Sequence, residues 1–391
     1  MANIRAAVIG VGNMGTAHAA CLAAGKVEGM ALTAVCDIAT ERLDACAERF
    51  PEAARYADWQ ELLREHQPEA VIVAVPHPLH GEIASACLAA GCHTLVEKPI
   101  DIALSRAQRL CRAAQESGRV FGIMFNQRTN PLFRRCREIV QGGQLGEMKR
   151  TVWIITNWYR TQHYYDSGSW RATWGGEGGG VLLNQAPHNL DLWQWICGMP
   201  ESVTAYCDTA KYHRIEVEDE ATLLTHYKNG ATGAFITSTG EYPGTNRLEI
   251  SGTKGKLVLE NGVMKWWRLA QDEAEVRFQS QENFAKIPVD YEEILPDGPE
   301  AAHAGILNDF SLAIRTGTPL LAPGVEGVHE LTLSNAAYLS QWLGNVSVSL
   351  PLDTALFDRL LQERAAQSVY KPREAQGRPE GEYSDRWQVR W

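Results

Sequence analysis

The sequence lacks any apolar run near the roughly 20 residues that a membrane-spanning helix requires, which makes a membrane role improbable. Its nine cysteines, an odd number, include no Cys-x-x-Cys pair and fit neither a disulfide framework nor a zinc knuckle. Positive charge is also scarce: 37 Lys and Arg stand against 47 Asp and Glu, a formal net charge of −10. Nucleic-acid binding requires clustered cations. We therefore expect reduced thiols and small-molecule partners, with no nucleic acid and no membrane.

The first residues, Met1-Ala2-Asn3, lead directly into an apolar segment, without the charged, apolar and cleavage regions of a signal peptide. This start predicts a cytoplasmic protein. The chain has 391 residues, of which 45% are apolar and 21% charged, a globular composition long enough for about two domains.

Residues 1–125 alternate short apolar runs with helix-like stretches. The apolar runs lie at 4–9, 31–36, 70–75, 93–96 and 120–125, and the helical stretches at about 14–25, 40–49, 58–66, 79–90 and 104–117. Strands that are apolar throughout are typical of a parallel sheet with helices on both faces. The sequence predicts an α/β, doubly wound parallel sheet in this first domain.

Residues 126–365 follow another rhythm, with strand-like segments joined by short turns such as Lys228-Asn229-Gly230. The segments lie at 148–158, 203–209, 221–227, 232–239, 247–251, 256–260 and 264–269, and helical patterns return at about 299–316, 324–343 and 353–366. Such turns favour antiparallel hairpins, so we expect an α+β domain with a large, mostly antiparallel open sheet. Another subunit normally covers an open sheet face, which predicts a homo-dimer or homo-tetramer. Residues 366–391 have no clear period and are expected to form a C-terminal tail.

The run Gly10-Val11-Gly12-Asn13-Met14-Gly15 follows a predicted strand and opens a predicted helix. Its glycines permit a tight turn, a close approach of pyrophosphate to the backbone, and close packing of helix on strand. Asp37 ends the next strand, 22 residues after Gly15, where a carboxylate accepts hydrogen bonds from the ribose of NAD and repels the 2′-phosphate of NADP. Residues 38–40 include no arginine, so NAD is expected over NADP; the alternative is that Asp37 caps the helix from Thr40.

Lys98, in Glu97-Lys98-Pro99, lies just past a predicted strand, and in open parallel sheets ligands bind outside the carboxyl ends of the strands. A proline can fix a turn that aims the lysine inward. The alternative is a solvent-exposed lysine in a turn.

A glycine-rich segment, residues 175–180, precedes an amphipathic helix. Asn184, His188 and Asp191 share one face if the turn between them is helical. The glycines permit close approach of a ligand, which favours a catalytic histidine over a packed one. Asp191 either supports His188 or pairs with a nearby arginine.

Six of the twelve tryptophans lie between residues 153 and 195, with tyrosines and arginines among them. Flat apolar faces with polar tips suit a pyranose; the alternative is a partner surface. We assign Tyr164, Tyr165, Trp170 and Arg171 to a carbohydrate site, and Trp193 and Trp195 to the core. His213, Glu216 and Glu218 do not alternate on one strand face, so no metal site is predicted.

The glycine-rich turn, Val75-Pro76-x-x-x-His80, Glu97-Lys98-Pro99 and the glycines before His188 together resemble the glucose-fructose oxidoreductase and inositol dehydrogenase (Gfo/Idh/MocA) family over about residues 4–350. The resemblance implies a Rossmann domain, an open-sheet domain, and oxidation or reduction of a sugar or cyclitol carbon with a nicotinamide. It assigns Lys98 to the reacting hydroxyl and His188 to acid or base chemistry. Further cofactor contacts are expected from Val75, Pro76, His77, His80, Glu97, Lys98 and Gln127.

Many polyol dehydrogenases of that family carry aspartate where this chain has Asn184, so a carboxylate behind the histidine is in question. The aromatic stretch and Asn184 resemble the subgroup that oxidises C3 of sugars and glycosides. We therefore predict an NAD-dependent dehydrogenase acting on a pyranose, glycoside or inositol. The alternatives are a glycosidase that retains NAD and oxidises C3 transiently, which would accumulate no NADH, and a nucleotide-bound sensor.

Overall fold

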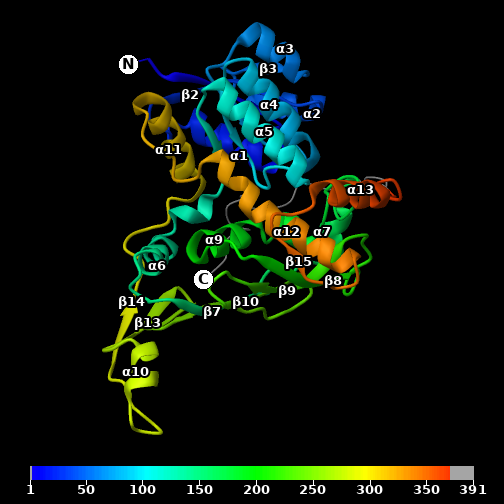
Figure 1. The fold of residues 1–391 in the computed structure, drawn as a ribbon. Helices are drawn as coiled ribbons and strands as arrows, with labels where there is room; N and C mark the ends of the chain where they lie inside the picture. Colours follow the sequence, from blue (N-terminus) through cyan, green and yellow to red (C-terminus); the bar gives the residue numbers. More distant parts are fainter. Residues whose placement is uncertain (1, 370–391) are drawn as a thin grey trace.

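The structure, a computed structural model, describes residues 2–369 and contains two sheets with helices packed on them (Figure 1). The predicted tail from residue 370 onward lies outside the described residues. No helix within residues 2–369 is long and apolar enough to cross a membrane.

The first sheet is fully parallel and has six strands in the order β3-β2-β1-β4-β5-β6. Its strands are β1 (Ile4–Ile9), β2 (Met30–Cys36), β3 (Ala54–Tyr56), β4 (Ala70–Val73), β5 (His93–Val96) and β6 (Phe121–Ile123). Its helical elements are α1 (Asn13–Ala23), α2 (Thr40–Arg49), α3 (Trp59–Glu61), η1 (Leu62–His66), η2 (His77–Leu79), α4 (His80–Ala89) and α5 (Leu104–Ser117). The predicted doubly wound sheet is confirmed, with β3 as an additional strand. The strand order reverses between β1 and β4, which opens a crevice at their carboxyl ends.

The second sheet has nine strands in the order β14-β13-β12-β11-β7-β10-β9-β8-β15. They are β7 (Met148–Ile155), β8 (Ser202–Thr209), β9 (Glu218–His226), β10 (Thr232–Ser238), β11 (Asn246–Gly252), β12 (Gly255–Glu260), β13 (Val263–Leu269), β14 (Val289–Ile294) and β15 (Val348–Ser349). Only the β7–β10 pair is parallel, so the mostly antiparallel sheet is confirmed. Strands β14 and β15 were not predicted.

Helical elements after residue 125 cover one face of this sheet and connect it to the first (Figure 1). They are η3 (Asn126–Thr129), α6 (Pro131–Gln141), α7 (Gln162–Asp166), α8 (Val181–Asn184), α9 (Pro187–Cys197), α10 (Glu273–Gln279), α11 (Ala302–Thr316), η4 (Gly324–Glu326), α12 (Gly327–Trp342) and α13 (Thr354–Ala365). Helix α10 lies apart from that face, in the projecting arm before β14 (Figure 1). Helices α6, α7, α8 and α10 were not predicted.

The late helices return to the first sheet. On α11, Asn308 Oδ1 accepts the N–H of Glu28 at 2.9 Å, and Ser311 donates to the Glu28 carbonyl at 2.6 Å. On α12, Asn335 Oδ1 accepts the N–H of Leu104 at the start of α5, at 2.9 Å. Residues far apart in sequence therefore hold the two sheets together.

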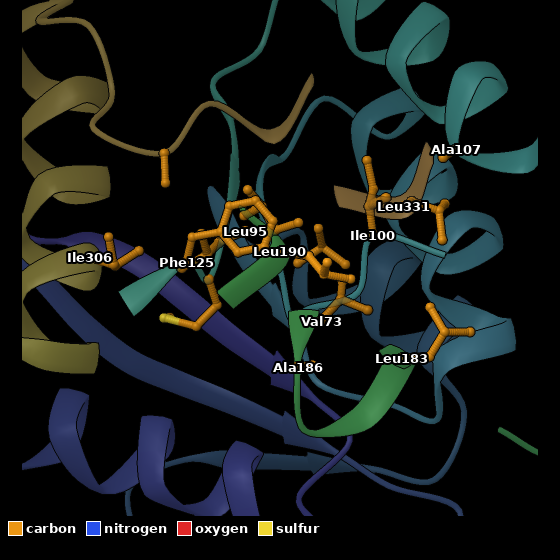
Figure 2. Close-up of a cluster of buried hydrophobic side chains, with 14 of the residues drawn as sticks. Val73, Leu95, Ile100, Ala107, Phe125, Leu183, Ala186, Leu190, Ile306 and Leu331 are labelled. Atoms are coloured by element: carbon orange, nitrogen blue, oxygen red, sulfur yellow. The ribbon is translucent and has the colours of Figure 1, made fainter. Parts of the chain in front are cut away.

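One core of buried apolar side chains includes residues of both sheets. Figure 2 shows the part of it in which helices that follow residue 125 meet the parallel strands. Leu183 of α8 and Leu190 of α9 belong to the same cluster of buried side chains as Val73 of β4 and Leu95 of β5. Burying a leucine contributes roughly 1.5–3 kcal/mol. The core thus fixes α8 and α9 against the carboxyl ends of β4 and β5, where a ligand site is expected.

Candidate active site

A cleft of about 2100 Å³ runs along the carboxyl ends of the parallel strands and under the second domain. Most residues assigned to the site from the sequence line it, namely Gly10, Val11, Gly12, Asn13, Met14, Asp37, Val75, Pro76, His77, His80, Glu97, Lys98, Gln127, Tyr164, Trp170, Arg171, Asn184 and His188. Three others, Gly15, Tyr165 and Asp191, are not among the lining residues.

The glycine-rich turn has the shape that a dinucleotide needs. Gly10 has φ +88°, and a Cβ there would lie 2.5 Å from the Ala74 carbonyl oxygen. A Cβ on Gly15 would lie 1.8 Å from the Gly10 oxygen, so Gly15 packs the helix on the strand instead of facing the cleft. At Gly12 a Cβ would meet only Arg42 Nη1, at 3.8 Å. The turn is therefore open at Gly12, beside the N-terminus of α1, where pyrophosphate fits.

Asp37 lies beside the glycine-rich turn at one end of the cleft. It is 6% exposed, and its carboxylate accepts the N–H groups of Val11 and Ala39, each at 2.9 Å. Arg42 Nη1 lies 3.1 Å from the same carboxylate. The N-cap residue of α2 is Ala39, and it makes no side-chain cap. Asp37 is thus fixed beside the glycine-rich turn.

His80 joins the loops after β4 and β5. Its Nδ1 lies 2.6 Å from the Pro99 oxygen and its Nε2 lies 2.8 Å from the Val75 oxygen. His77 Nδ1 lies 3.3 Å from the Glu177 oxygen, and its ring centroid is 5.9 Å from that of Trp170. The Val75–His80 segment therefore connects the nucleotide end of the cleft to the aromatic end.

Lys98 follows β5 and points inward, because its Nζ donates to the Asn184 carbonyl oxygen at 2.7 Å. Burial lowers the pKa of Lys98, while Glu97, Glu330 and Glu177 oppose that shift. The exposed-lysine alternative is excluded by this contact. The Lys98–Pro99 peptide bond is cis.

Glu97, next to Lys98, is buried and pairs with His18, a contact that the sequence analysis missed. One carboxylate oxygen lies 2.7 Å from His18 Nε2, and the other accepts the Lys98 N–H at 3.1 Å. Burial opposes ionisation of Glu97, but the hydrogen bond and charge of His18, with His303 and Lys98, lower its pKa to about 2. Glu97 is therefore an anion that fixes the backbone at Lys98.

His188 lies in the first turn of α9 with its ring against Phe125, at a centroid distance of 6.4 Å. Burial, followed by the charge of Lys98, lowers the pKa of His188 well below its ordinary value. A neutral imidazole can accept a proton. The side chain therefore has the protonation state that a general base needs.

Asn184 does not share a helical face with His188, because α8 ends at Asn184 and α9 begins at Pro187, whereas Asp191 lies in α9, three residues after His188. Asp191 instead faces Arg128, whose Nε and Nη2 donate to its carboxylate at 2.8 and 2.6 Å. Arg128 is fully buried and also bonds Glu326. Of the two alternatives for Asp191, the structure shows the arginine pair, so this carboxylate does not support His188.

A carboxylate does reach the site from Glu177, which the sequence analysis did not single out. Its side chain accepts from Asn184 Nδ2 and from the Ala172 N–H. Asn184 Oδ1 accepts the Tyr164 hydroxyl at 3.2 Å, and Arg171 Nη1 donates to that hydroxyl oxygen at 2.8 Å. Glu177 is the one charged residue in the glycine-rich segment 175–180, a signal that was available in the sequence.

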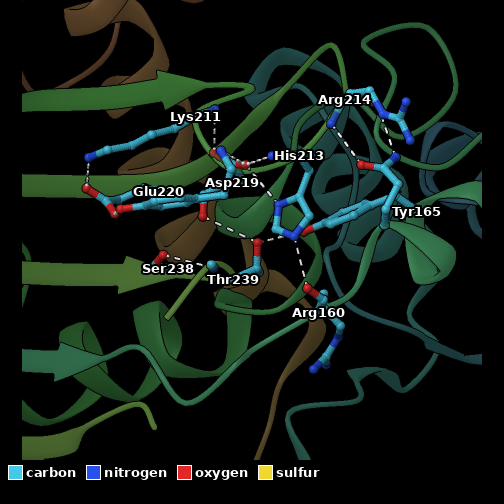
Figure 3. Close-up of polar contacts among 12 residues, drawn as sticks. Arg160, Tyr165, Lys211, His213, Arg214, Asp219, Glu220, Ser238 and Thr239 are labelled. Carbon is cyan, nitrogen blue, oxygen red and sulfur yellow. Dashed lines mark hydrogen bonds and ion pairs between the residues drawn. The ribbon is translucent and has the colours of Figure 1, made fainter. Parts of the chain in front are cut away.

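Tyr165, next to Tyr164 in the sequence, lies among Thr239, His213 and Arg160 (Figure 3). It is 3% exposed, and its hydroxyl lies 2.7 Å from Thr239 Oγ1. Its ring packs on His213 at a centroid distance of 4.8 Å. The assignment of Tyr165 to sugar contact is therefore not supported, because its contacts are with Thr239, just after β10, and with His213, and it does not line the cleft.

The residues weighed as a metal cluster have separate partners. His213 Nδ1 lies 2.9 Å from Asp219 (Figure 3), and Glu216 accepts the Val369 N–H at 2.6 Å. Glu218 accepts the N–H groups of Gly180 and Leu182 at the start of α8. No group of metal-ligating side chains occurs in residues 2–369.

Several buried polar atoms of the cleft-lining residues have no hydrogen-bond partner within residues 2–369. They are Asn126 Oδ1, Gln127 Oε1, Gln185 Oε1 and His188 Nδ1. Buried polar groups in proteins are nearly always paired. These atoms therefore indicate a ligand with several hydroxyl or amide groups.

Two family models match the chain. One, an oxidoreductase family with an NAD-binding Rossmann fold, matches residues 4–125, and the other, the GFO/IDH/MocA C-terminal domain, matches residues 133–258. A myo-inositol 2-dehydrogenase of Thermotoga maritima is 27% identical over 264 residues, 66% of this chain and 75% of that protein. A D-glucoside 3-dehydrogenase of Escherichia coli is 30% identical over 208 residues, 52% of this chain and 57% of that protein.

A solved structure shows a similar fold. The WlbA dehydrogenase from Chromobacterium violaceum, in complex with NADH and UDP-GlcNAcA, is 27% identical with a TM-score of 0.76. The match covers 90% of this chain and 97% of that chain.

Proposed function

Because the chain belongs to the GFO/IDH/MocA family of oxidoreductases, we propose that it is an NAD-dependent dehydrogenase that oxidises a secondary hydroxyl of a pyranose, a glycoside or an inositol. Two of the relatives described above are named dehydrogenases of an inositol and a glucoside, and the third is a dehydrogenase in complex with NADH and UDP-GlcNAcA. They favour this activity over an NAD-retaining glycosidase or a sensor.

The cofactor end of the cleft suits NAD. Gly12 leaves room for the pyrophosphate, and Asp37 presents a buried carboxylate to a ribose. NAD, when bound, supplies hydride transfer. The protein has to place the reacting carbon and accept the proton of the hydroxyl.

Lys98 and His188 are proposed for that proton chemistry. Lys98 Nζ is held by the Asn184 carbonyl, so its charge is placed to stabilise a developing alkoxide. His188, neutral in its buried position, takes the hydroxyl proton. General-base assistance of this kind is typically worth about 10²–10⁴-fold in rate.

The observation that carries the substrate class is the set of unpaired buried atoms on Asn126, Gln127, Gln185 and His188. The three amide oxygens require donors and His188 Nδ1 can donate or accept, and a ring with several hydroxyl groups offers both kinds of partner. Trp170 and Tyr164 add flat faces to the same cleft, and Arg171 lies 4.6 and 4.7 Å from their ring centroids. Together they favour a pyranose or cyclitol over an acyclic alcohol.

The test is a panel of pyranoses, alkyl and aryl glucosides, inositols and acyclic polyols, incubated with the enzyme and NAD while NADH is followed by absorbance. We expect stoichiometric NADH with at least one cyclic substrate and none with the Lys98→Met variant. NADH from acyclic alcohols alone would reject the proposal. Release of aglycone without NADH would support the glycosidase instead.

We also infer that the enzyme forms a homo-dimer or homo-tetramer through the outer face of the nine-stranded sheet. This face, opposite the helices, presents Tyr206 and Leu224, which are 53% and 46% exposed. Such apolar surface is typical of an interface. Light scattering at micromolar concentration should give an oligomer, and Leu224→Asp should shift it toward monomer; a monomeric wild type would contradict this inference.

A cytoplasmic location is the remaining proposal. All nine cysteines are free, and most are buried, which suits a reducing compartment. Fractionation of the producing cells would test it, and recovery of the enzyme outside the cytoplasm would overturn it.

A further inference from the structure

Glu177 is held from several sides in the segment that leads into α8. It is 2% exposed, and its carboxylate accepts the Ala172 N–H at 2.6 Å and Asn184 Nδ2. Its own N–H donates to the Thr173 oxygen at 2.9 Å, and its carbonyl oxygen lies 3.3 Å from His77 Nδ1. The side chain therefore has one defined place between the loop after β4 and the start of the Asn184 turn.

Asn184 depends on that contact for its orientation. An amide has its donor and acceptor on opposite branches, so holding Nδ2 at Glu177 turns Oδ1 toward the Tyr164 hydroxyl, 3.2 Å away. The backbone oxygen of the same residue accepts Lys98 Nζ at 2.7 Å. Asn184 thus contacts both Lys98 and Tyr164.

The charges around Glu177 are positive. Its hydrogen-bond partners are donors, and its nearby charged groups, Arg171 and Lys98, are cations. Burial raises the pKa of Glu177, and those cations, the Ala172 N–H and Asn184 act in the opposite direction. The charged groups that act on Lys98 are Glu97, Glu330, Glu177 and Arg171, so Glu177 is one of three carboxylates that balance the lysine.

We propose that Glu177 is a positioning residue for catalysis: it fixes the Asn184 amide between Lys98 and Tyr164 and supplies the negative charge that balances Lys98 and Arg171. This inference rests on the proposed dehydrogenase function. In it, the carboxylate acts on the proton-transfer site through Asn184 and touches neither substrate nor cofactor.

The first test is Glu177→Gln, which keeps the size of the side chain and removes its charge. Misplacing a catalytic group by about 1 Å can cost 10²-fold, so we expect kcat to fall roughly 10- to 100-fold. The dissociation constant of NAD should stay within about threefold, because Glu177 does not contact the dinucleotide site. Loss of a neighbouring negative charge should also lower the pKa of Lys98 and shift the pH–rate profile to lower pH.

The matched control is Glu216→Gln. The backbone N–H of Glu216 donates to the Ala172 oxygen, and its side chain accepts the Val369 N–H outside the cleft. This variant removes the same charge nearby without touching Asn184. We expect wild-type kcat and an unchanged pH profile; an effect equal to that of Glu177→Gln would show that net charge alone matters and overturn the proposal.

The second test moves the charge. Asn184→Asp alone places two carboxylates in contact and should lower both kcat and the urea midpoint of unfolding. Combined with Glu177→Gln, it restores one carboxylate and one amide with their places exchanged. We expect the double variant to recover at least tenfold in kcat over either single variant, and to recover the urea midpoint lost in Asn184→Asp.

Additive losses in the double variant, or wild-type kcat and pH profile in Glu177→Gln, would overturn the proposal. The double-mutant cycle measured by urea unfolding needs no substrate. It therefore tests the coupling between residues 177 and 184 even if no sugar in the panel is oxidised. If the wild type is inactive but the urea-unfolding midpoints of the variants still show coupling, the contact between residues 177 and 184 stands. The dehydrogenase function, and with it the catalytic consequence of this contact, would then be refuted. If Glu177→Gln does not fold, Asn184→Asp with and without Glu177→Ala tests the same coupling, because the alanine removes one of the two carboxylates brought into contact.

Discussion

Arg42 Nη1 lies 3.1 Å from the carboxylate of Asp37, which also accepts the Val11 N–H at 2.9 Å. One carboxylate thus supports the glycine-rich turn and holds a guanidinium at the edge of the cleft. The Arg42 side chain is 45% exposed. Cofactor choice should therefore depend on both residues.

We predict that wild type uses NAD at least about tenfold more efficiently than NADP, because Asp37 repels a 2′-phosphate. Asp37→Ala should narrow that ratio by removing the ribose acceptor and freeing Arg42 for phosphate. Asp37→Ala combined with Arg42→Ala should lose the gain for NADP. Values of kcat/KM with both cofactors provide the measurement, and equal values in wild type would contradict the prediction.

Lys98→Ala and His188→Ala should each lower kcat by about two orders of magnitude or more, since both act on the hydroxyl. NAD affinity, measured by fluorescence titration, should remain within a few-fold. The two effects should not add, because the groups serve the same proton transfer. Near-normal turnover in His188→Ala with an unchanged pH profile would make the histidine structural.

Asp191→Asn should destabilise the fold without changing the chemistry. It leaves Arg128, which is fully buried, without its bidentate partner, and breaking such a pair costs about 3–5 kcal/mol. Thermal and urea unfolding should show the loss, while kcat below the unfolding temperature stays within a few-fold. A selective loss of kcat at unchanged stability would restore Asp191 to the catalytic group.

Glu218 should make stability depend on pH near neutrality. Burial raises its pKa to about 7, although Leu182, Tyr338 and Gly180 donate hydrogen bonds to it. The folded state therefore holds a proton that the unfolded chain releases near pH 4.5, and stability falls as pH rises from there through about 7. Glu218→Gln should remove this part of the pH dependence of the unfolding free energy.

Urea unfolding of wild type and Glu218→Gln between pH 4.5 and 8 measures how the unfolding free energy of each protein changes with pH. A shift of this size corresponds to roughly 3 kcal/mol, as an order of magnitude. The variant should gain stability relative to wild type as pH rises. Parallel pH curves for the two proteins would show that Glu218 is ionised throughout the range.

Much of the fold follows from local patterns. Apolar runs such as Ile4–Ile9 and His93–Val96 are recovered as strands β1 and β5 because helices bury both of their faces. Strand β14, Val289–Ile294, has five consecutive exposed residues and three acids, so no alternation marks it. The division at residue 125 remains a prediction.

Local sequence patterns predicted several of the residues that line the cleft, such as Gly10, Gly12 and Lys98. The site was not predictable where distant side chains decide between equivalent positions. Tyr164 and Tyr165 are adjacent and chemically identical, and only the contacts of Tyr165 with Thr239 and His213 determine which one faces the cleft. Asp191 was similarly settled by Arg128, 63 residues away in the chain.

The return of α11 to the first sheet limits how this enzyme can be recombined with its relatives. Asn308 and Ser311 hold the loop at Glu28, and Asn335 of α12 holds the start of α5. A chimera that exchanges only the nucleotide-binding half would break these contacts and leave both surfaces mismatched. Substitutions around Glu28 and on α11 are thus expected to occur together during evolution, because the two segments are in contact.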